Sequence, residues 1–204
     1  MKKTVLRLGT TLMVMITGCI SSIHPIYTEK ELVYDEALLG VWHSTKPESN
    51  ETYHVTRTGE RAYHLVLTDN NEKQGDFHVH LASVRGTLFL NVQPAKLPLE
   101  SRFPNLWNIH IIRGHFFCIV KQIEPELKIK ILDIDWLEQH LENEPSAIDH
   151  TILTHASNNE QGKIVLTAST EQLQQFAIKH LKTPGAFTDS ESLRKETSDA
   201  EQVP

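Results

Sequence analysis

The feature that most constrains the fold is a period-two alternation of apolar and polar residues between about residue 38 and residue 131. Successive side chains of a β-strand point to opposite faces, so this alternation is typical of half-buried strands. Short turn signals such as Arg85-Gly86 and Glu124-Pro125 interrupt it. Eight strands are predicted, around residues 38–44, 53–56, 63–67, 77–81, 88–92, 107–111, 115–123 and 127–131. Such short links favour an antiparallel meander, closed into a barrel or wrapped into a sandwich.

After residue 132 the pattern changes to that of helices. Asp135 and Ser169 can each cap a first helical turn, which predicts helices over 136–143 and 170–182. Apolar residues recur in both at spacings of three and four, so each helix has one face to bury. The run from Phe116 to Val120 is apolar throughout, so we expect helices to cover its outer face. The predicted fold is therefore mainly β with a C-terminal α+β part.

The first nineteen residues indicate a location. A basic start is followed by an apolar run over residues 5–16 that is too short to span a bilayer as a helix. The run ends in Ile16-Thr17-Gly18-Cys19, which resembles a bacterial lipobox. The resemblance implies that the Cys19 sulfur takes up a diacylglycerol group, with acyl chains such as palmitate, and that cleavage removes residues 1–18. An ordinary secretory signal is the alternative, but no Ala-x-Ala cleavage site is nearby.

Lipidation would make the membrane a partner of this chain through Cys19, because two or three acyl chains anchor a protein permanently. The residue after Cys19 is Ile20 and not Asp. In a Gram-negative host, the resemblance implies the periplasmic face of the outer membrane. The expected localisation is the cell envelope.

Two further resemblances concern the folded part. Gly40-Val41-Trp42 resembles the Gly-x-Trp signature of lipocalins, which implies that Trp42 plugs the closed end of a barrel that holds an apolar ligand. The second lipocalin signature is not visible after Thr68-Asp69, and an ordinary core role for Trp42 is the alternative. The chain is also similar to a family of uncharacterised bacterial lipoproteins, which implies no activity or ligand. The matching segments are residues 25–30, 38–42, 132–137 and 166–187.

Composition excludes some classes of function. Removal of residues 1–18 takes away three bases and no acid, so the formal charge falls from −6 to −9, which argues against a nucleic-acid partner. With Cys19 lipidated, Cys118 is the only other cysteine, and its apolar surroundings predict a buried, inert thiol. No cofactor or catalytic motif is present, and neither Ser44 nor Ser83 lies in a nucleophile elbow.

Four histidines share one predicted strand face. His54, His64, His78 and His80 alternate with the apolar residues of consecutive strands, and His78 and His80 have a spacing that can chelate a divalent metal if a third ligand is close. The same alternation places them on the outer, solvated side. We therefore expect no metal site. If one exists, these four histidines are its candidate ligands.

The sequence divides into five parts. These are a signal peptide (1–18), a lipidated N-terminus and tether (19–36), an antiparallel β domain (37–133), an α/β extension packed on it (134–187) and a disordered tail (188–204). The expected function is non-enzymatic: binding of an apolar small molecule, or a structural role in the envelope. A metal- or pH-responsive protein that binds a partner through the histidine face is one alternative, and a hydrolase with an unrecognised site is another.

Overall fold

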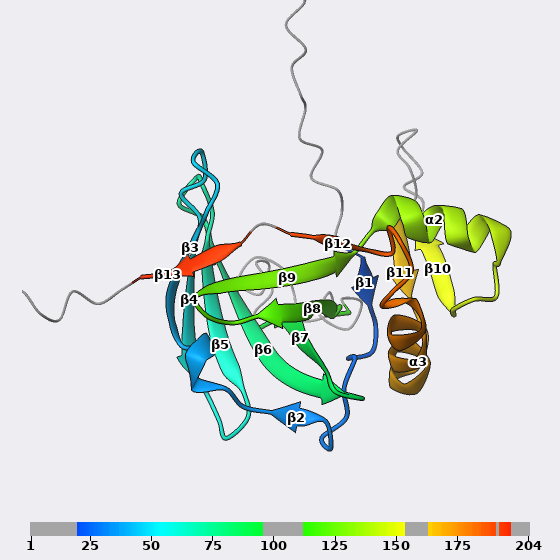
Figure 1. Ribbon diagram of the computed structural model, residues 1–204, viewed down its shortest axis with the longest axis horizontal. Helices are drawn as coiled ribbons and strands as arrows, with labels where there is room; N and C mark the ends of the chain where they lie inside the picture. Colours follow the sequence, from blue (N-terminus) through cyan, green and yellow to red (C-terminus); the bar gives the residue numbers. More distant parts are fainter. Residues whose placement is uncertain (1–19, 96–111, 154–162, 191, 197–204) are drawn as a thin grey trace, which may run out of the picture.

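A computed structural model describes residues 20–95, 112–153, 163–190 and 192–196. It contains a closed barrel of eight antiparallel strands in which each strand is hydrogen-bonded to two neighbours (Figure 1). In the order around the barrel, the strands are β3 (Gly40–Ser44), β4 (Thr52–Arg57), β5 (Tyr63–Thr68), β6 (Gln74–Val84), β7 (Thr87–Pro94), β8 (Phe116–Gln122), β9 (Glu126–Leu132) and β13 (Leu193–Lys195). The fold is thus mainly β, and the barrel is the correct one of the two predicted arrangements.

Seven of the eight predicted strands correspond to β3 through β9. The eighth, at residues 107–111, lies outside the described residues. The strand that closes the barrel is β13, where Leu193 pairs with Ser44 of β3 and with Leu127 of β9. The expectation of a disordered tail over 188–204 is therefore wrong for this segment. A segment of three residues with one apolar side chain is too short to show a strand period. The edges of β3 and β9 offer unpaired backbone groups, and β13 pairs with both.

The predicted tether is also wrong, because residues 20–36 pack against the body of the protein. They form β1 (Ser21–Ser22), β2 (Leu32–Val33) and the start of the 3₁₀-helix η1 (Glu36–Leu38). Ile26 is completely buried, and its backbone N–H donates to Oδ1 of the buried Asn91 at 3.3 Å. β2 pairs with β6 on the barrel. Apolar residues spaced without period gave no sign of this packing.

A smaller α/β unit lies beside the barrel. It contains the helices α2 (Ile134–Asn143) and α3 (Thr170–His180), and a sheet in which β1 pairs with β11 (Lys163–Leu166) and β11 with β10 (His150–Leu153). After α3, strand β12 (Phe187–Asp189) returns to the barrel and pairs antiparallel with the end of β9. Ser169 and Gln172 form the predicted capping box of α3. The α2 helix begins before the predicted start because Asp133, not Asp135, accepts the capping hydrogen bond from the Trp136 N–H.

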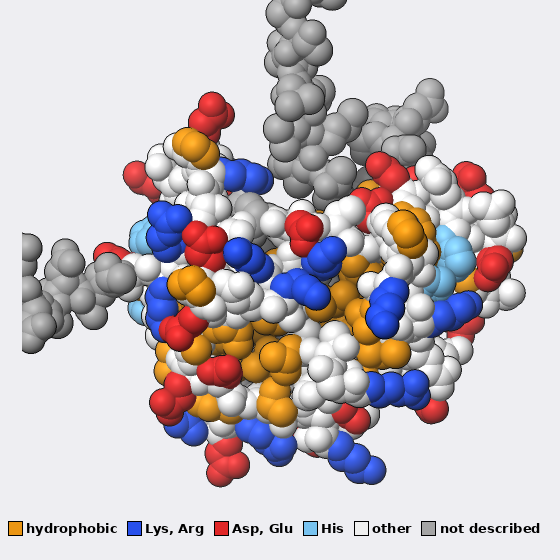
Figure 2. Space-filling view, in the orientation of Figure 1, with side chains coloured by type: hydrophobic (Ala, Val, Ile, Leu, Met, Phe, Trp, Pro, Cys, Tyr) orange, Lys and Arg blue, Asp and Glu red, His pale blue; other side chains and the backbone are white. Residues whose placement is uncertain are grey.

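Charged side chains of both signs are interspersed over the face drawn in Figure 2. Among the described residues, no helix has the length and apolar character needed to cross a bilayer.

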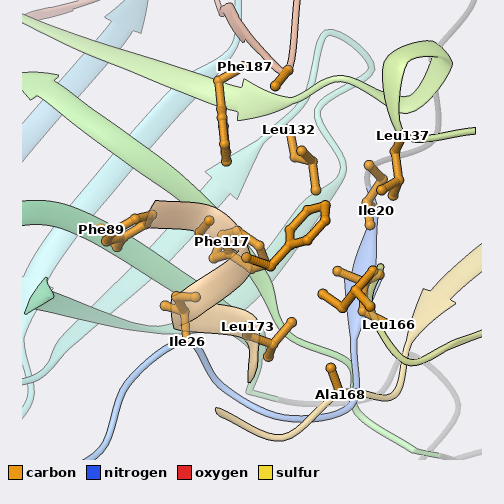
Figure 3. Packing of buried hydrophobic residues seen from close by; sticks show 14 of the residues in the cluster. Ile20, Ile26, Phe89, Phe117, Leu132, Leu137, Leu166, Ala168, Leu173 and Phe187 are labelled. Carbon is orange, nitrogen blue, oxygen red and sulfur yellow. The ribbon is translucent and has the colours of Figure 1, made fainter. Parts of the chain in front are cut away.

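Two hydrophobic clusters meet at β8, as its doubly apolar sequence predicted. Phe117 and Ile119 face outward into a cluster with α2 and α3, whereas Cys118 and Val120 belong to the cluster inside the barrel. Phe89 and Phe117 pack edge to face at 6.4 Å, and Leu137 of α2 and Leu173 of α3 come in from the helices (Figure 3). The outer cluster joins the barrel to the α/β unit. The interior of the barrel is lined by the second cluster, whose residues come from the inward faces of the strands.

Candidate ligand cavity

The described residues of the barrel surround a cavity of about 560 Å³ that is partly open to solvent. Most of its wall is apolar, because the inward-facing residues of the alternating strands point into it. The apolar lining includes Val55, Leu65, Leu67, Phe77, Val79, Leu90, Val92, Leu127, Ile129, Ile131 and Leu193. Small-molecule sites are typically apolar cavities of about 300–1,000 Å³ with a few polar groups. The size and the chemistry of this cavity both fall in that class.

Trp42 lines the cavity beside η1, which lies where β3 begins. The side chain is completely buried, and its indole N–H donates to the carbonyl of Leu38 in η1 at 2.9 Å. The polar end of the ring is thus satisfied, and the apolar part of the ring is available to the cavity. Trp42 is therefore both a core residue and part of the cavity wall.

Gly40 of the Gly-x-Trp pattern has a structural reason to be glycine. Its φ is +123°, which L side chains rarely adopt, and a Cβ there would lie 2.9 Å from Cε of Lys195. The Lys195 ammonium donates to the carbonyl of Ala37 at 3.0 Å and lies 5.4 Å from the centre of the Trp42 ring. Strand β13 therefore supplies the cation that covers Trp42, which the sequence alone did not predict.

Tyr63 joins η1 to the cavity wall. Its hydroxyl accepts from the N–H of Asp35 at 2.7 Å and donates to the carbonyl of Asp35 at 3.1 Å. Burial raises the pKa of Tyr63 to about 12, so the phenol keeps its proton at neutral pH. The Tyr63 ring stacks on the Tyr34 ring with a centroid distance of 5.0 Å, and the Arg57 guanidinium lies over the Tyr34 ring. These contacts hold η1 against the barrel.

A polar group of residues lines the cavity where β8 begins. Backbone hydrogen bonds of 2.8 and 2.7 Å join Ser22 and His115, and Ser21 and His115 both line the cavity. Oδ1 of Asn91 accepts from the backbone N–H of Ile26, and its Nδ2 lies 3.0 Å from Nδ1 of His115. On the other side of the ring, Nε2 of Gln93 lies 3.2 Å from Nε2 of His115. Burial lowers the pKa of His115, and His24 and His80 lower it further. The cavity thus has a neutral polar edge.

The four candidate metal ligands lie on the outside of the barrel, as predicted, but they do not converge. His54 and His78 are exposed. His64 is opposite His78 across β5 and β6, and its Nε2 lies 3.0 Å from the Asp76 carboxylate. His80 packs against the Tyr27 ring at 4.9 Å, and burial lowers its pKa. Among the described residues, no three His, Cys, Asp or Glu side chains form a group that could hold a metal ion.

A different histidine pair was missed by the sequence analysis. His140 of α2 and His180 of α3 have ring centres 4.8 Å apart, within a group of rings that includes Trp136 and Phe176. The Nε2 atoms of both imidazoles are buried without a hydrogen-bond partner among the described residues. The Glu144 carboxylate lies 4.0 Å from Nε2 of His140, beyond hydrogen-bonding distance. The pKa of His180 is lowered mainly by burial and further by the neighbouring His140. The available signal was an aromatic residue four positions before each histidine.

Cys118 is buried, as predicted, and contributes to the cavity wall. Comparisons of the chain with family models, with curated proteins and with solved structures give no match. Function is therefore inferred from the cavity and from the N-terminal sequence.

Proposed function

We propose that this protein is a lipid-anchored component of the bacterial cell envelope that holds an apolar small molecule inside its barrel. The observation that supports it is the cavity of about 560 Å³ with its largely aliphatic and aromatic wall. A purely structural envelope protein has no need of such a volume and would be expected to fill its barrel with side chains. A ligand that suits this wall is predominantly apolar, with a small polar group at the edge formed by Ser21 and His115.

The apolar wall of the cavity favours a ligand. Removal of apolar surface from water contributes roughly 25 cal/mol per Å². An apolar molecule in the cavity would cover wall residues such as Leu67, Phe77 and Val92 and would shield its own surface from water. Its binding would therefore stabilise the folded state.

The proposed anchor rests on the lipobox at residues 16–19 and on the packing of the chain that follows. Ile20 is 6% exposed and belongs to the outer hydrophobic cluster. The folded part would therefore begin one residue after the lipidated Cys19. In a Gram-negative host, we expect the protein on the periplasmic face of the outer membrane.

Ligand binding can be tested by titration with an apolar fluorescent probe such as N-phenyl-1-naphthylamine. The wild-type protein should enhance the probe emission in a saturable way, and the variant Leu67→Trp should weaken binding because Leu67 lines the cavity. Val66→Trp is the matched control, because Val66 is the neighbouring residue on β5 and does not line the cavity. Equal binding by both variants, with unchanged melting temperatures, would contradict the proposal.

The anchor can be tested with Cys19→Ser, since lipidation depends on the Cys19 thiol. The variant should leave the membrane fraction or remain unprocessed in cells. Normal maturation and equal membrane retention would rule out the lipoprotein assignment. This outcome would leave the ligand proposal standing, because that proposal depends on the barrel alone.

A further inference from the structure

The small sheet fixes where the chain enters the folded body. β1 runs parallel to β11, and the register pairs Ser21 with Val165 and Ser22 with Leu166. Because the two strands are parallel, Ile20, which precedes Ser21, lies on the side of Ile164, which precedes Val165. In the neighbouring strand β10, Ile152 pairs with Ile164 and Leu153 pairs with Lys163. The chain before Ile20 therefore joins the sheet at the end where β10 finishes and β11 begins. This end is called the entry edge below and consists of Ile152, Leu153 and Lys163.

The entry edge carries exposed apolar side chains. Among the described residues, only three large hydrophobic side chains are exposed: Ile112 (74%), Ile152 (56%) and Leu153 (50%). Two of these three belong to the entry edge. Ile152 shares a face of the sheet with the buried Ile164, whereas Leu153 shares the opposite face with Lys163. Both residues lie at the end of the sheet, next in sequence to residues 154–162, which are outside the described residues.

The start of the described chain is bound both to the small sheet and to the barrel. Ser22 is completely buried and Ile20 nearly so. The Ser22 hydroxyl donates to the carbonyl of His24 at 2.8 Å, and the backbone of Ser22 is bonded to His115 of the barrel. A lipid group on the residue before Ile20 would thus have no flexible spacer between it and this sheet, since consecutive Cα atoms are about 3.8 Å apart.

We propose that the entry edge is the surface with which the protein rests on its own membrane, with Ile152 and Leu153 in the boundary between headgroups and acyl chains. The inference rests on the proposed lipid anchor and adds an orientation to it. Apolar side chains of peripheral proteins commonly enter this boundary to a depth of about 5–10 Å. Lys163 is exposed beside them, and its ammonium suits anionic headgroups. A lipid surface is favoured over a protein partner because the anchor brings that surface to this edge.

Depth-dependent quenching tests the orientation on the full, lipidated protein. The variant Leu153→Cys is labelled with bimane and reconstituted into vesicles of phosphatidylethanolamine and phosphatidylglycerol, with or without brominated acyl chains. Cys118 is buried, and the Cys19 sulfur is blocked by lipid, so the label should report on one site. The matched control is Glu60→Cys, an exposed position in the link between β4 and β5 of the barrel.

Brominated lipid should quench most of the emission at position 153 and little at position 60. A second variant, Ile152→Asp with the label at 153, should lose much of that quenching because a carboxylate resists entry into the boundary. Flotation of the vesicles reports the anchor separately. Protein that floats with the vesicles and shows equal, weak quenching at both positions would overturn the orientation and keep the anchor. Protein that does not float would overturn both.

Discussion

Filling the barrel should stabilise the ligand-free protein, and Val79→Phe is the substitution that tests this. Val79 is a small residue of β6 that is 5% exposed and lines the cavity. A phenyl ring at this position extends into the cavity, which no side chain of the described residues fills. At roughly 25 cal/mol per Å², each ~40 Å² of apolar surface that the new ring removes from water contributes about 1 kcal/mol.

The control for this experiment is Val84→Phe on the same strand. Val84 is 2% exposed and belongs to the packed cluster between the barrel and the helices. Additional atoms in a packed core cost about 1–3 kcal/mol. The two substitutions are chemically identical, so the hollow barrel predicts opposite signs for them.

Thermal and urea unfolding of ligand-free protein, refolded from denaturant, measure the two effects. A gain of 1 kcal/mol in a domain of this size corresponds to about 2–4 °C in Tm. Val79→Phe should raise the Tm by this amount and weaken probe binding, and Val84→Phe should lower the Tm. Destabilisation by both substitutions to the same extent would show that the barrel interior is packed, and would refute the reasoning.

Three other predictions concern single side chains. Tyr63→Phe should cost about 1–3 kcal/mol because it leaves the Asp35 backbone groups unpaired, whereas Tyr34→Phe should be neutral, since the Tyr34 hydroxyl is buried without a hydrogen-bond partner in the described structure; equal urea midpoints would contradict this. Burial holds the pKa of His180 in the folded state below the ordinary histidine value of about 6.5, so the unfolded chain binds the proton more readily and stability should fall as pH drops below about 6.5. His180→Gln should flatten this dependence, and an unchanged slope in unfolding measured from pH 7.5 to 5 would count against it. Micromolar zinc should leave the Tm unchanged, and a zinc-dependent rise lost in His78→Ala would restore the metal-binding alternative.

The alternating strands were predictable because one face of each is buried and the other is solvated. Leu65 and Leu67 point into the barrel and His64 points out, so apolar and polar residues alternate along the strand. The closure by Leu193–Lys195 was not predictable, since the place of these three residues depends on the edges of β3 and β9 and not on a pattern of their own. Tertiary context overrides local pattern in such short segments.

The candidate site divides in the same way. The sequence singled out Trp42, and the structure places it in the cavity wall. The cavity itself was beyond sequence reasoning, because a filled barrel and a hollow one require the same alternation of inward and outward residues. The pairing of His140 with His180 depends on how α2 and α3 cross, which neither helix encodes alone.

Native mass spectrometry of the mature protein, purified without detergent exchange and without refolding, tests the central claim most directly. If the barrel holds an apolar molecule, the folded protein should carry an additional mass that is lost on denaturation and reduced in Leu67→Trp but not in Val66→Trp. The same mass under native and denaturing conditions, together with no binding of added apolar probe, would contradict the account.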